Sequence, residues 1–259
     1  MRFRSVTAKL SELMYRVPGT KKRRSSAAII AAAGNGSRMG NIAKQFIEID
    51  GFPAVYYSLI AFEKSLNVEQ VIIVTRNDDI EKMKNIVEKY GFKKVTDIVS
   101  GGSTRDESVK NGFEKLKNNI KYVAIHDAAR PLITTEKIDF VFRDAYKYGA
   151  ACACSKVVDT VKKADGSGFI KKTIPREDLY AAQTPQIFSC DIYRTALAIH
   201  LKGDLAVTDD CSMVENAGFK IKLSDIGIPN LKLTVPQDYD IIDSILKKRG
   251  AEKCLADSE

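Results

Sequence analysis

An apolar run at residues 27–33 and the glycine-rich loop after it constrain the fold of this chain most strongly. The run consists of small and β-branched side chains, which predicts a short strand buried on both faces. Gly34 and Gly36 come next, and without side chains they let peptide N–H groups approach a phosphate chain closely. Arg38 and Lys44 then add positive charge. A strand that ends in such a loop is typical of a triphosphate-binding site.

Two common nucleotide-binding loops do not fit this spacing. A dinucleotide-binding fingerprint needs glycine where Met39 stands. A P-loop ends in Gly-Lys-Ser/Thr, and residues 34–44 contain no such ending. An ordinary turn between a strand and a helix, with cations on its surface, is therefore the alternative to a phosphate-binding loop.

Strand and helix patterns alternate through the first half of the chain. Apolar runs predict the strands, and apolar residues at helical spacing predict the helices. Strands are expected at about residues 27–33, 69–75, 93–99 and 122–125, and helices at about residues 54–66, 78–90, 105–117 and 135–148. This alternation predicts an α/β fold, Rossmann-like, with a mostly parallel sheet and helices on both faces.

The pattern changes after residue 150. A strand is expected at residues 151–156, and the alternating segment after it predicts a projecting β-hairpin arm at about residues 156–182. Residues 175–188 are expected to be irregular. Further helices are expected at residues 191–201, after Asp209 and at residues 236–248. We expect one domain over residues 26–250 and a short tail at residues 251–259.

The net charge of +8 is concentrated at the N-terminus. Residues 1–25 contain the single acid Glu12 against the basic residues Arg2, Arg4, Lys9, Arg16, Lys21, Lys22, Arg23 and Arg24. The rest of the chain is near neutral, so no nucleic-acid partner is expected. We expect this basic extension to be disordered, with an amphipathic segment on a membrane surface or an organelle presequence as alternatives.

Hydropathy and cysteine content indicate a reduced compartment. No apolar run approaches the roughly 20 residues that cross a bilayer, so we expect no membrane span and a cytoplasmic location. The five cysteines are an odd count without a Cys-x-x-Cys pair, and only two histidines accompany them. This composition favours free thiols over disulfides or a zinc site.

Polar residues gather where the predicted strands end. Residues 100–103 (Ser-Gly-Gly-Ser) follow one strand, and residues 126–131 (His-Asp-Ala-Ala-Arg-Pro) follow another. The carboxyl ends of parallel strands meet at one edge of a sheet, where ligands bind. Asp127 suits Mg²⁺, which takes few protein carboxylates and leaves its other positions to phosphates and water. A loop or helix-capping aspartate is the alternative reading of this residue.

No arrangement of a nucleophile with a histidine and an acid is evident in the sequence. What remains is a set of cations, hydroxyls, amides and one candidate Mg²⁺ carboxylate. These groups favour phosphoryl or nucleotidyl transfer, because those reactions need positioning and charge stabilisation more than a covalent intermediate.

Eight motifs in collinear order carry a resemblance to a known family. They are Ala-Ala-Gly-x-Gly-x-Arg-Met (32–39), Lys44-Gln45, Gly-Gly-x-x-Arg-x-x-Ser-Val (101–109), His-Asp-Ala-Ala-Arg-Pro (126–131), Asp-Thr-Val-Lys (159–162), Gln-Thr-Pro-Gln-x-Phe (183–188), Thr-Asp-Asp (208–210) and Asn-x-Lys-x-Thr-x-Pro-x-Asp (230–238). Over about residues 26–248 the chain resembles the 2-C-methyl-D-erythritol 4-phosphate cytidylyltransferase family of the non-mevalonate isoprenoid pathway. The basic extension lies outside the resemblance.

The resemblance implies a nucleotidyltransferase-type fold and a reaction of CTP with methylerythritol phosphate, a polyol phosphate, in the presence of Mg²⁺ or another divalent cation. By position, Arg38, Lys44 and Lys232 would be catalytic, and Asp127 would hold the metal. The nucleotide would be bound by Ala32, Ala33, Gly34, Asn35, Gly36, Gly102, Ser103, Ser108 and Ala129. The acceptor phosphate would be held by Arg130, Thr160, Arg176, Thr184, Thr208 and Lys232. The arm would interlock with a second subunit, which implies a homodimer.

Two other functions stay open at this point. The ribitol 5-phosphate cytidylyltransferases have similar motifs, although that relative tends to begin its loop with Ala-Gly-Gly and to carry Ser-Val where this chain has Ala128-Ala129. A non-catalytic nucleotide-binding protein is the second, and the presence of Arg38 and Lys44 argues against it. The spacing between these two cations is tighter than in some relatives.

Overall fold

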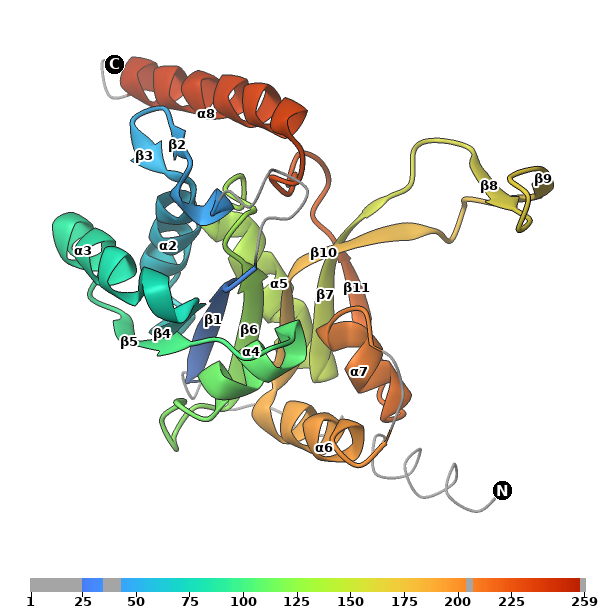
Figure 1. Cartoon of the computed structure of the whole chain (residues 1–259), viewed down its shortest axis with the longest axis horizontal. Helices are drawn as coiled ribbons and strands as arrows, with labels where there is room; N and C mark the ends of the chain where they lie inside the picture. The colour runs from blue at the N-terminus through green and yellow to red at the C-terminus, as the bar shows by residue number, and fades with distance from the viewer. Residues whose placement is uncertain (1–24, 35–42, 204–206, 257–259) are drawn as a thin grey trace.

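A seven-stranded sheet forms the centre of the computed structural model, which describes residues 25–34, 43–203 and 207–256, with side chains through residue 250. From one edge to the other the strands are β11 (Lys222–Asp225), β7 (Ala150–Lys156), β10 (Tyr180–Ser189), β6 (Tyr122–Asp127), β1 (Ser26–Ala32), β4 (Val68–Thr75) and β5 (Val95–Ser100). Only β10 runs antiparallel to its neighbours in this sheet. The predicted α/β architecture with a mostly parallel sheet is confirmed (Figure 1).

Strand β1 lies between β4 and β6 and is covered on both faces. Its alternate residues enter different cores: Ala28 and Ile30 pack on one side, and Ala27 and Ile29 on the other. Because successive side chains of a strand point to opposite faces, only an apolar run without alternation fits this position. The buried strand predicted from residues 27–33 is thus present at the centre of the sheet.

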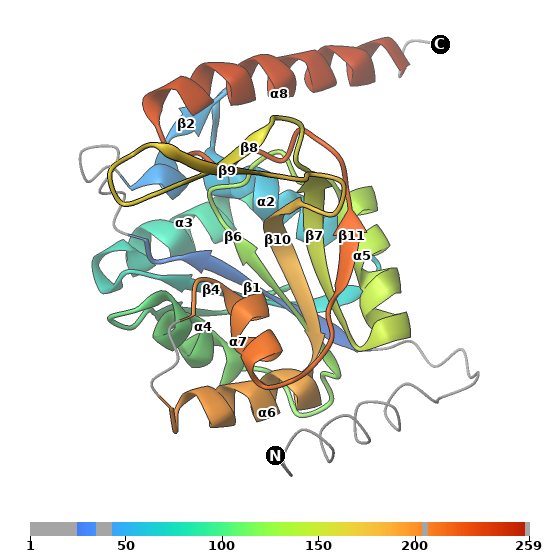
Figure 2. The same ribbon diagram turned by 90° about the vertical axis from the view of Figure 1, so that its right-hand side faces the viewer.

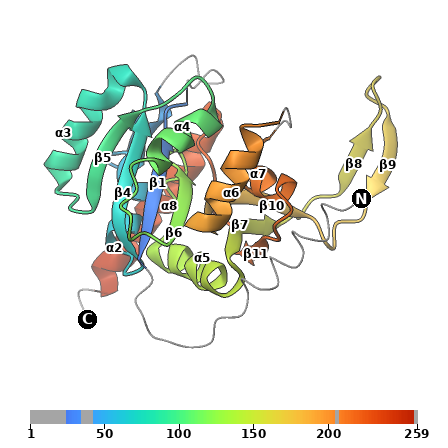
Figure 3. The same cartoon turned by 90° about the horizontal axis from the view of Figure 1, so that it is seen from below.

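Helices cover both faces of the sheet (Figure 3). One core is closed by α2 (Ala54–Lys64), α3 (Ile80–Tyr90) and α5 (Thr135–Tyr148), and the other by α4 (Arg105–Phe113), α6 (Cys190–His200) and α7 (Asp210–Asn216). Gly91 ends α3 with a left-handed φ of 65°, a conformation that glycine adopts without a steric penalty. Helix α4 ends at Phe113, earlier than the predicted residue 117.

The expectation of irregular structure at residues 175–188 is wrong for its second part. Strand β10 begins at Tyr180 and pairs with β7 and β6 on its two sides. Its register shifts between Ala182 and Gln186, which accommodates the proline in Gln-Thr-Pro-Gln within a strand. Strand β11, which pairs in parallel with β7, was not predicted either.

The last helix, α8, spans Pro236–Ala256 and therefore continues beyond the predicted end at residue 248. Residues 251–256, the first part of the expected C-terminal tail, continue this helix. Apolar residues of α8, among them Ile242 and Leu246, pack with Leu233 and with Ile49 of the small ribbon formed by β2 (Glu48–Ile49) and β3 (Phe52–Pro53). This packing closes the third apolar cluster above α2.

A two-stranded arm extends from the sheet, as predicted. Strands β8 (Val161–Ala164) and β9 (Ile170–Ile174) pair antiparallel with each other and leave the body of the molecule between β7 and β10 (Figures 1 and 2). The side chains of Val158, Phe169 and Ile170 are 68%, 73% and 67% exposed.

Two further expectations concern membranes and thiols. None of the helices among the described residues has the length and apolar character needed to cross a membrane. Cys152, Cys154, Cys190 and Cys211 are buried and free, in agreement with the predicted thiols. The expected disorder of residues 1–25 concerns residues that lie, except for Ser25, outside the described part of the chain.

Candidate active site

A cavity of about 480 Å³ opens at the carboxyl ends of β1 and β6. It is lined by Ala31, Ala32, Ala33, Gly34, Lys44, Gln45, Gly102, Ser103, Thr104, Arg105, Ser108, Asp127, Ala128, Ala129 and Lys232. These residues come from five separate segments of the chain: the end of β1, the short helix η2 (Lys44–Phe46), the start of α4, the end of β6 and the loop before α8. The sheet topology therefore brings the predicted strand-end motifs to one place, where ligands of open α/β sheets bind.

The loop after β5 approaches β1 so closely that it requires glycine. A Cβ atom at Gly101 would lie 2.6 Å from the Cβ of Ala33 and 2.8 Å from the Oγ of Ser108, both shorter than real contacts allow. A Cβ at Gly102 would overlap the side chain of Glu107. The Gly102 N–H donates to Ser108 Oγ at 3.0 Å, and Ser108 Oγ in turn donates to the Thr104 carbonyl at 2.8 Å. This wall of the cavity is fixed by short contacts between backbone and small side chains.

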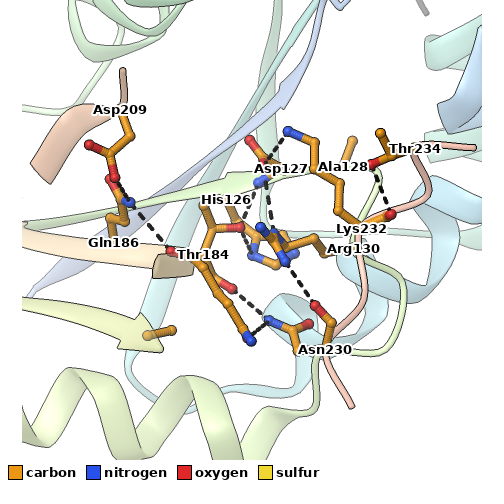
Figure 4. Close-up of polar contacts among 12 residues, drawn as sticks. His126, Asp127, Ala128, Arg130, Thr184, Gln186, Asp209, Asn230, Lys232 and Thr234 are labelled. Atoms are coloured by element: carbon orange, nitrogen blue, oxygen red, sulfur yellow. Dashed lines mark hydrogen bonds and ion pairs between the residues drawn. The ribbon is translucent and has the colours of Figure 1, made fainter. Parts of the chain in front are cut away.

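Asp127 is the only acidic residue that lines the cavity among the described residues, and cations surround it (Figure 4). Lys232 Nζ donates to its Oδ2 at 2.8 Å. Arg105 Nη2 lies 3.6 Å from Oδ1, and Arg130 Nε lies 3.6 Å from Oδ2. Burial alone would favour the protonated acid, but Lys232, Arg105 and Arg130 outweigh it and hold the pKa of Asp127 well below its usual range. The carboxylate is therefore ionised at neutral pH.

A buried chain of hydrogen bonds supports Asp127 from below (Figure 4). The Asp127 N–H donates to Thr184 Oγ1 at 3.1 Å, and the same hydroxyl oxygen lies 3.1 Å from His126 Nδ1. His126 is fully buried, and this burial lowers its pKa to about 3. A neutral imidazole at this position can accept a hydrogen bond from the Thr184 hydroxyl. This hydrogen bond fixes the end of β6.

Lys44 and Lys232 are held by the loop that precedes α8. Lys44 Nζ donates to the Thr234 carbonyl at 2.9 Å, and Thr234 Oγ1 donates to the Lys232 carbonyl at 3.0 Å. Asp238 accepts hydrogen bonds from the N–H groups of Thr234 and Val235, which fixes the start of α8 beneath this loop. Both ammonium groups thus reach the cavity from a shared, hydrogen-bonded support.

The described residues contain no cluster of three acidic, histidine or cysteine side chains that could hold a metal ion. Asp127 offers the cavity a single carboxylate. Mg²⁺ commonly binds through one or two carboxylates and takes its remaining ligands from substrate phosphates and water. The donor set therefore fits a Mg²⁺ ion shared with a triphosphate and does not fit an ion enclosed by protein ligands alone.

Comparison with protein families decides between the classes of enzyme that could use this cavity. Residues 26–248 match the family model described as "IspD: 2-C-methyl-D-erythritol 4-phosphate cytidylyltransferase". The chain belongs to this cytidylyltransferase family. The matched span covers the sheet, the arm and most of α8, and it begins at the first residue of β1.

Curated relatives and solved structures agree with the family. The chain is 40% identical over 222 residues to the 2-C-methyl-D-erythritol 4-phosphate cytidylyltransferase of Clostridium novyi, an alignment that covers 85% of this chain and 96% of the relative. It is 41% identical over 227 residues to that of Clostridium acetobutylicum, covering 87% and 99%. The crystal structure of 4-diphosphocytidyl-2C-methyl-D-erythritol synthase from Anaerococcus prevotii matches with a TM-score of 0.78 and 28% identity, covering 87% of this chain and all of that one.

Most residues expected to bind the nucleotide of a cytidylyltransferase line the cavity. They are Ala32, Ala33, Gly34, Gly102, Ser103, Ser108 and Ala129, together with the expected catalytic residues Lys44 and Lys232 and the expected metal ligand Asp127. Asn35, Gly36 and Arg38 lie outside the described residues. The geometry brings these side chains together, and their individual roles in the cytidylyltransferase stay predictions.

Apart from Lys232, the residues expected to hold the acceptor lie outside this lining. Arg130 lies behind Asp127, with its Nη1 donating to the Asn230 carbonyl at 2.8 Å. Thr184 is buried beneath the site, and its hydroxyl is engaged by Asp127 and His126, so it is placed to orient Asp127. Thr208 is exposed before α7 and donates its N–H to Ser212. Thr160 and Arg176 are exposed at the base of the arm, where Arg176 donates to the Val158 carbonyl.

Three residues outside the expected site set lie in the cavity wall, or in or beside the buried Gln183–Gln186 segment next to it. Arg105 lines the cavity and contacts Asp127. Asn230 donates from Nδ2 to Gln183 Oε1 and to the Thr184 carbonyl, both at 3.0 Å. Gln186 donates to Asp209 Oδ2 at 2.6 Å (Figure 4). All lie inside the quoted motifs, but their partners are distant in sequence, so no local signal shows what they hold.

Proposed function

We propose that this chain transfers the CMP group of CTP to 2-C-methyl-D-erythritol 4-phosphate, giving CDP-methylerythritol and pyrophosphate. The observation that carries the proposal is the cavity at the end of β1 and β6, which joins Lys44, Lys232 and one ionised carboxylate in a chain of this family. Catalysis of nucleotidyl transfer depends mainly on positioning and on charge stabilisation, and these residues supply both.

The reaction is an in-line displacement at the α-phosphorus of CTP. An oxygen of the acceptor phosphate forms the new P–O bond, and the bond to the β-phosphate breaks as pyrophosphate leaves. No general base is needed, because a phosphate monoester is largely ionised near neutral pH. Lys44 lines the cavity, and we expect it, together with Arg38, to stabilise the charge that grows on the α-phosphate and on the leaving group. We expect Lys232, which lines the same cavity, to bind the acceptor phosphate.

We propose that Asp127 holds a divalent cation, with Mg²⁺ as the best fit. A bound Mg²⁺ would neutralise phosphate charge and bring the triphosphate oxygens together. In the structure, Lys232 donates to Asp127 at 2.8 Å and fills part of its coordination. Lys232 would therefore turn from Asp127 toward the acceptor phosphate when substrates bind, which leaves a carboxylate oxygen open for the metal.

We expect the backbone after β5 to select the base. Gly102 and Ser103 line the cavity wall, and their N–H groups donate to Ser108 Oγ and Glu107 Oε2, so their peptide carbonyls are the groups left to meet a base. A cytosine ring resting on this wall would meet hydrogen-bonding groups that cannot move without disturbing Gly101 and β1. Rigid peptide groups discriminate well between bases, since a wrong base leaves them unpaired.

We also propose that the acceptor half of the site is completed by a second copy of the chain through the arm. Thr160 and Arg176 are exposed, and the apolar side chains of Val158, Phe169 and Ile170 are more than two-thirds exposed on the same arm. Apolar residues in such numbers on a projecting hairpin favour burial against a partner. The cytoplasmic location of the enzyme stays a prediction from its sequence.

The test is pyrophosphate release with CTP and Mg²⁺ in four parallel reactions: with methylerythritol phosphate, with ribitol 5-phosphate, with both, and with neither. Turnover in the reactions that contain methylerythritol phosphate, and none with ribitol 5-phosphate as the sole acceptor, supports the proposal. Preference for ribitol 5-phosphate would keep the mechanism and contradict the acceptor. A folded chain that binds CTP and turns over neither acceptor would contradict the assignment as an enzyme.

A further inference from the structure

Arg105 occupies a position where a cation is not favoured by the helix itself. It is the first residue of α4, and the N-terminus of a helix carries a partial positive charge. Two acidic residues, Asp106 and Glu107, follow in the same turn, as is usual there. The Arg105 side chain does not extend into solvent, since it is only 34% exposed and lines the cavity. Contacts made elsewhere must therefore account for its placement.

The guanidinium of Arg105 joins two carboxylates that belong to distant segments. Its Nη1 donates to Asp210 Oδ2 at 2.5 Å, and its Nη2 lies 3.6 Å from Asp127 Oδ1. Asp210 is 3% exposed, and its other oxygen accepts a hydrogen bond from the buried Tyr193 hydroxyl at 2.9 Å. Asp210 is thus fixed by α6 as well as by Arg105. Arginine presents two separate amino groups in a rigid fork, one toward each carboxylate, whereas lysine has a single ammonium nitrogen.

These contacts link the two halves of the site. Asp127 ends β6 inside the cavity, and Asp210 is the first residue of α7. The residue before it, Asp209, caps α7 and accepts from Gln186 at 2.6 Å, and Thr208 stands directly before this cap. Arg105 itself belongs to the helix whose start carries the cavity wall at residues 102–104. One side chain therefore ties the wall, the candidate metal ligand and the segment that carries Thr208.

A purely structural ion pair is the other explanation for Arg105. Such a pair would be satisfied by Asp210 alone, which already takes the shorter of the two contacts. The second amino group instead lies toward Asp127, the one carboxylate that lines the cavity among the described residues. Positions that fix a reacting group are commonly supported by a neighbouring side chain of this kind, and small misplacements of reacting atoms are costly.

We propose that Arg105 is a positioning residue for the transfer reaction: it sets the Asp127 carboxylate against the Thr208–Asp210 segment. This inference rests on the proposed function for its kinetic test. The orientation of Asp127 determines how the metal and the triphosphate are presented, and the placement of Thr208 determines how the acceptor is received. Loss of the link should therefore affect turnover and acceptor binding more than it affects binding of the base.

Two variants distinguish the loss of the Arg105 contact geometry from the loss of its charge and from a folding defect. Arg105→Lys keeps the charge and the partner Asp210 but cannot span both carboxylates. The double variant Arg105→Met with Asp210→Asn removes the pair together, so that no unpaired charge is left buried. The matched control is Arg194→Met with Asp191→Asn, an exposed arginine–aspartate pair on α6 at 3.2 Å. Each protein is measured for melting temperature, for CTP affinity by calorimetry with and without Mg²⁺, and for kcat and acceptor KM.

We expect both Arg105 variants to lose about tenfold or more in kcat and to raise the acceptor KM several-fold, while Mg²⁺-free CTP affinity stays within about twofold. The control pair should leave kcat, acceptor KM and CTP affinity unchanged. Retention of kcat and acceptor KM in Arg105→Lys would overturn the proposal, as would losses in every parameter that follow the melting temperature. Should the double variant fail to fold, Arg105→Lys decides the question.

The CTP-binding measurement distinguishes failure of the positioning role of Arg105 from failure of the proposed function. If the parent turns over neither acceptor, the function fails, but the Mg²⁺-dependent gain in CTP affinity still reports on Asp127. A gain reduced about fivefold in Arg105→Lys, with Mg²⁺-free affinity unchanged, would support the positioning role. An undiminished gain would contradict it.

Discussion

The cavity end of the sheet and the β8–β9 arm differ in how their polar side chains are held. At the cavity, the polar groups of Asp127, Thr184 and Lys232 are bonded to residues of other segments, and Asp127 and Thr184 are buried. On the arm, Thr160 and Arg176 are exposed, and β8 and β9 pair only with each other among the described residues. The polar side chains at the cavity are thus preorganised, whereas those of the arm are not.

This difference follows from burial. A polar group removed from water must find a partner inside the protein, and the partner then fixes its direction. An exposed hydroxyl or guanidinium is satisfied by water and stays free to move. We therefore expect substitutions at the cavity to change the rate of the reaction, protein stability or nucleotide binding, and substitutions on the arm to change only how the acceptor or a second copy binds.

Lys44→Ala should have the largest effect. Its ammonium lines the cavity and is held by the Thr234 carbonyl, so it is preorganised for charge that develops on the phosphates. We expect kcat to fall about 100-fold or more, with CTP affinity changed much less. Steady-state kinetics and calorimetry with CTP measure the two effects. Lys82→Ala, an exposed lysine over the Phe46 ring, is the matched control. A rise in KM without a loss of kcat would contradict the assigned role.

Acid should destabilise the cavity end through His126. Its pKa in the folded protein is about 3, below the value of about 6.5 expected when unfolded. Below pH 6.5 the unfolded chain therefore binds a proton that the folded chain does not, and the free energy of unfolding falls by about 1.4 kcal/mol per pH unit. Because the unfolded histidine is only half protonated at pH 6.5, the loss between pH 6.5 and 5 is about 1.6 kcal/mol.

Urea unfolding of the parent and of His126→Gln at several pH values measures this contribution. The glutamine variant is expected to be less stable at pH 7, because it loses the hydrogen bonds of the imidazole ring with Thr184 and Ser58. Its stability should nevertheless fall less steeply between pH 6.5 and 5 than that of the parent. Equal slopes in the two proteins would show that His126 becomes protonated in the folded state and that this end of the sheet is less rigid than its hydrogen bonds indicate.

Gly101→Ala and Gly166→Ala compare the two regions with one kind of change. A methyl group at Gly101 would collide with Ala33 and Ser108, whereas nothing lies within 4 Å of the corresponding point at Gly166 in the arm turn. We expect Gly101→Ala to weaken CTP binding about tenfold and to lower the melting temperature, since the cavity wall must shift. Gly166→Ala should leave both within error. Similar effects from the two variants would remove the contrast between a packed wall and a free arm.

The same contrast explains how much of the molecule the sequence predicts. Strands β1, β4 and β6 are predicted because burial on both faces demands an apolar run, which is a local signal. The segment Gln183–Gln186 reads as a turn because polar residues and proline usually mark one. It lies in β10 because Asp127, Asn230 and Asp209 supply partners for its polar groups from far along the chain. Sequence patterns do not report such distant partners.

The candidate site follows the same rule. Glycines and cations in the motifs are visible as residue types, so most of the cavity lining is predicted by its resemblance to the family. The neighbours of a side chain are not visible in this way. Arg105 stands in a quoted motif, yet its contact with Asp210 joins residues 105 positions apart. Thr184 was expected to touch substrate, and the structure instead places its hydroxyl between Asp127 and His126.

Arg176→Ala should have the smallest effect on the protein and still a measurable one on the reaction. Its side chain is exposed and its one described hydrogen bond is to the Val158 carbonyl, so the melting temperature and CTP affinity should not change. If the arm completes the acceptor half of the site, the acceptor KM should rise about tenfold or more, as expected for loss of a charged hydrogen bond to phosphate.

Mixing experiments identify which copy supplies Arg176. The Lys44→Ala chain carries its defect in the cavity and has an intact arm. The Arg176→Ala chain carries its defect in the arm and has an intact cavity. If the arm serves the cavity of a second copy, a mixed dimer contains one site with both defects and one site with neither, so mixing should restore high-affinity turnover to part of the sites. If the arm serves its own cavity, every site carries one defect and mixing restores nothing. Recovery would show that the arm of one copy completes the acceptor site of the other. Failure to recover would show that a single chain supplies the whole acceptor site.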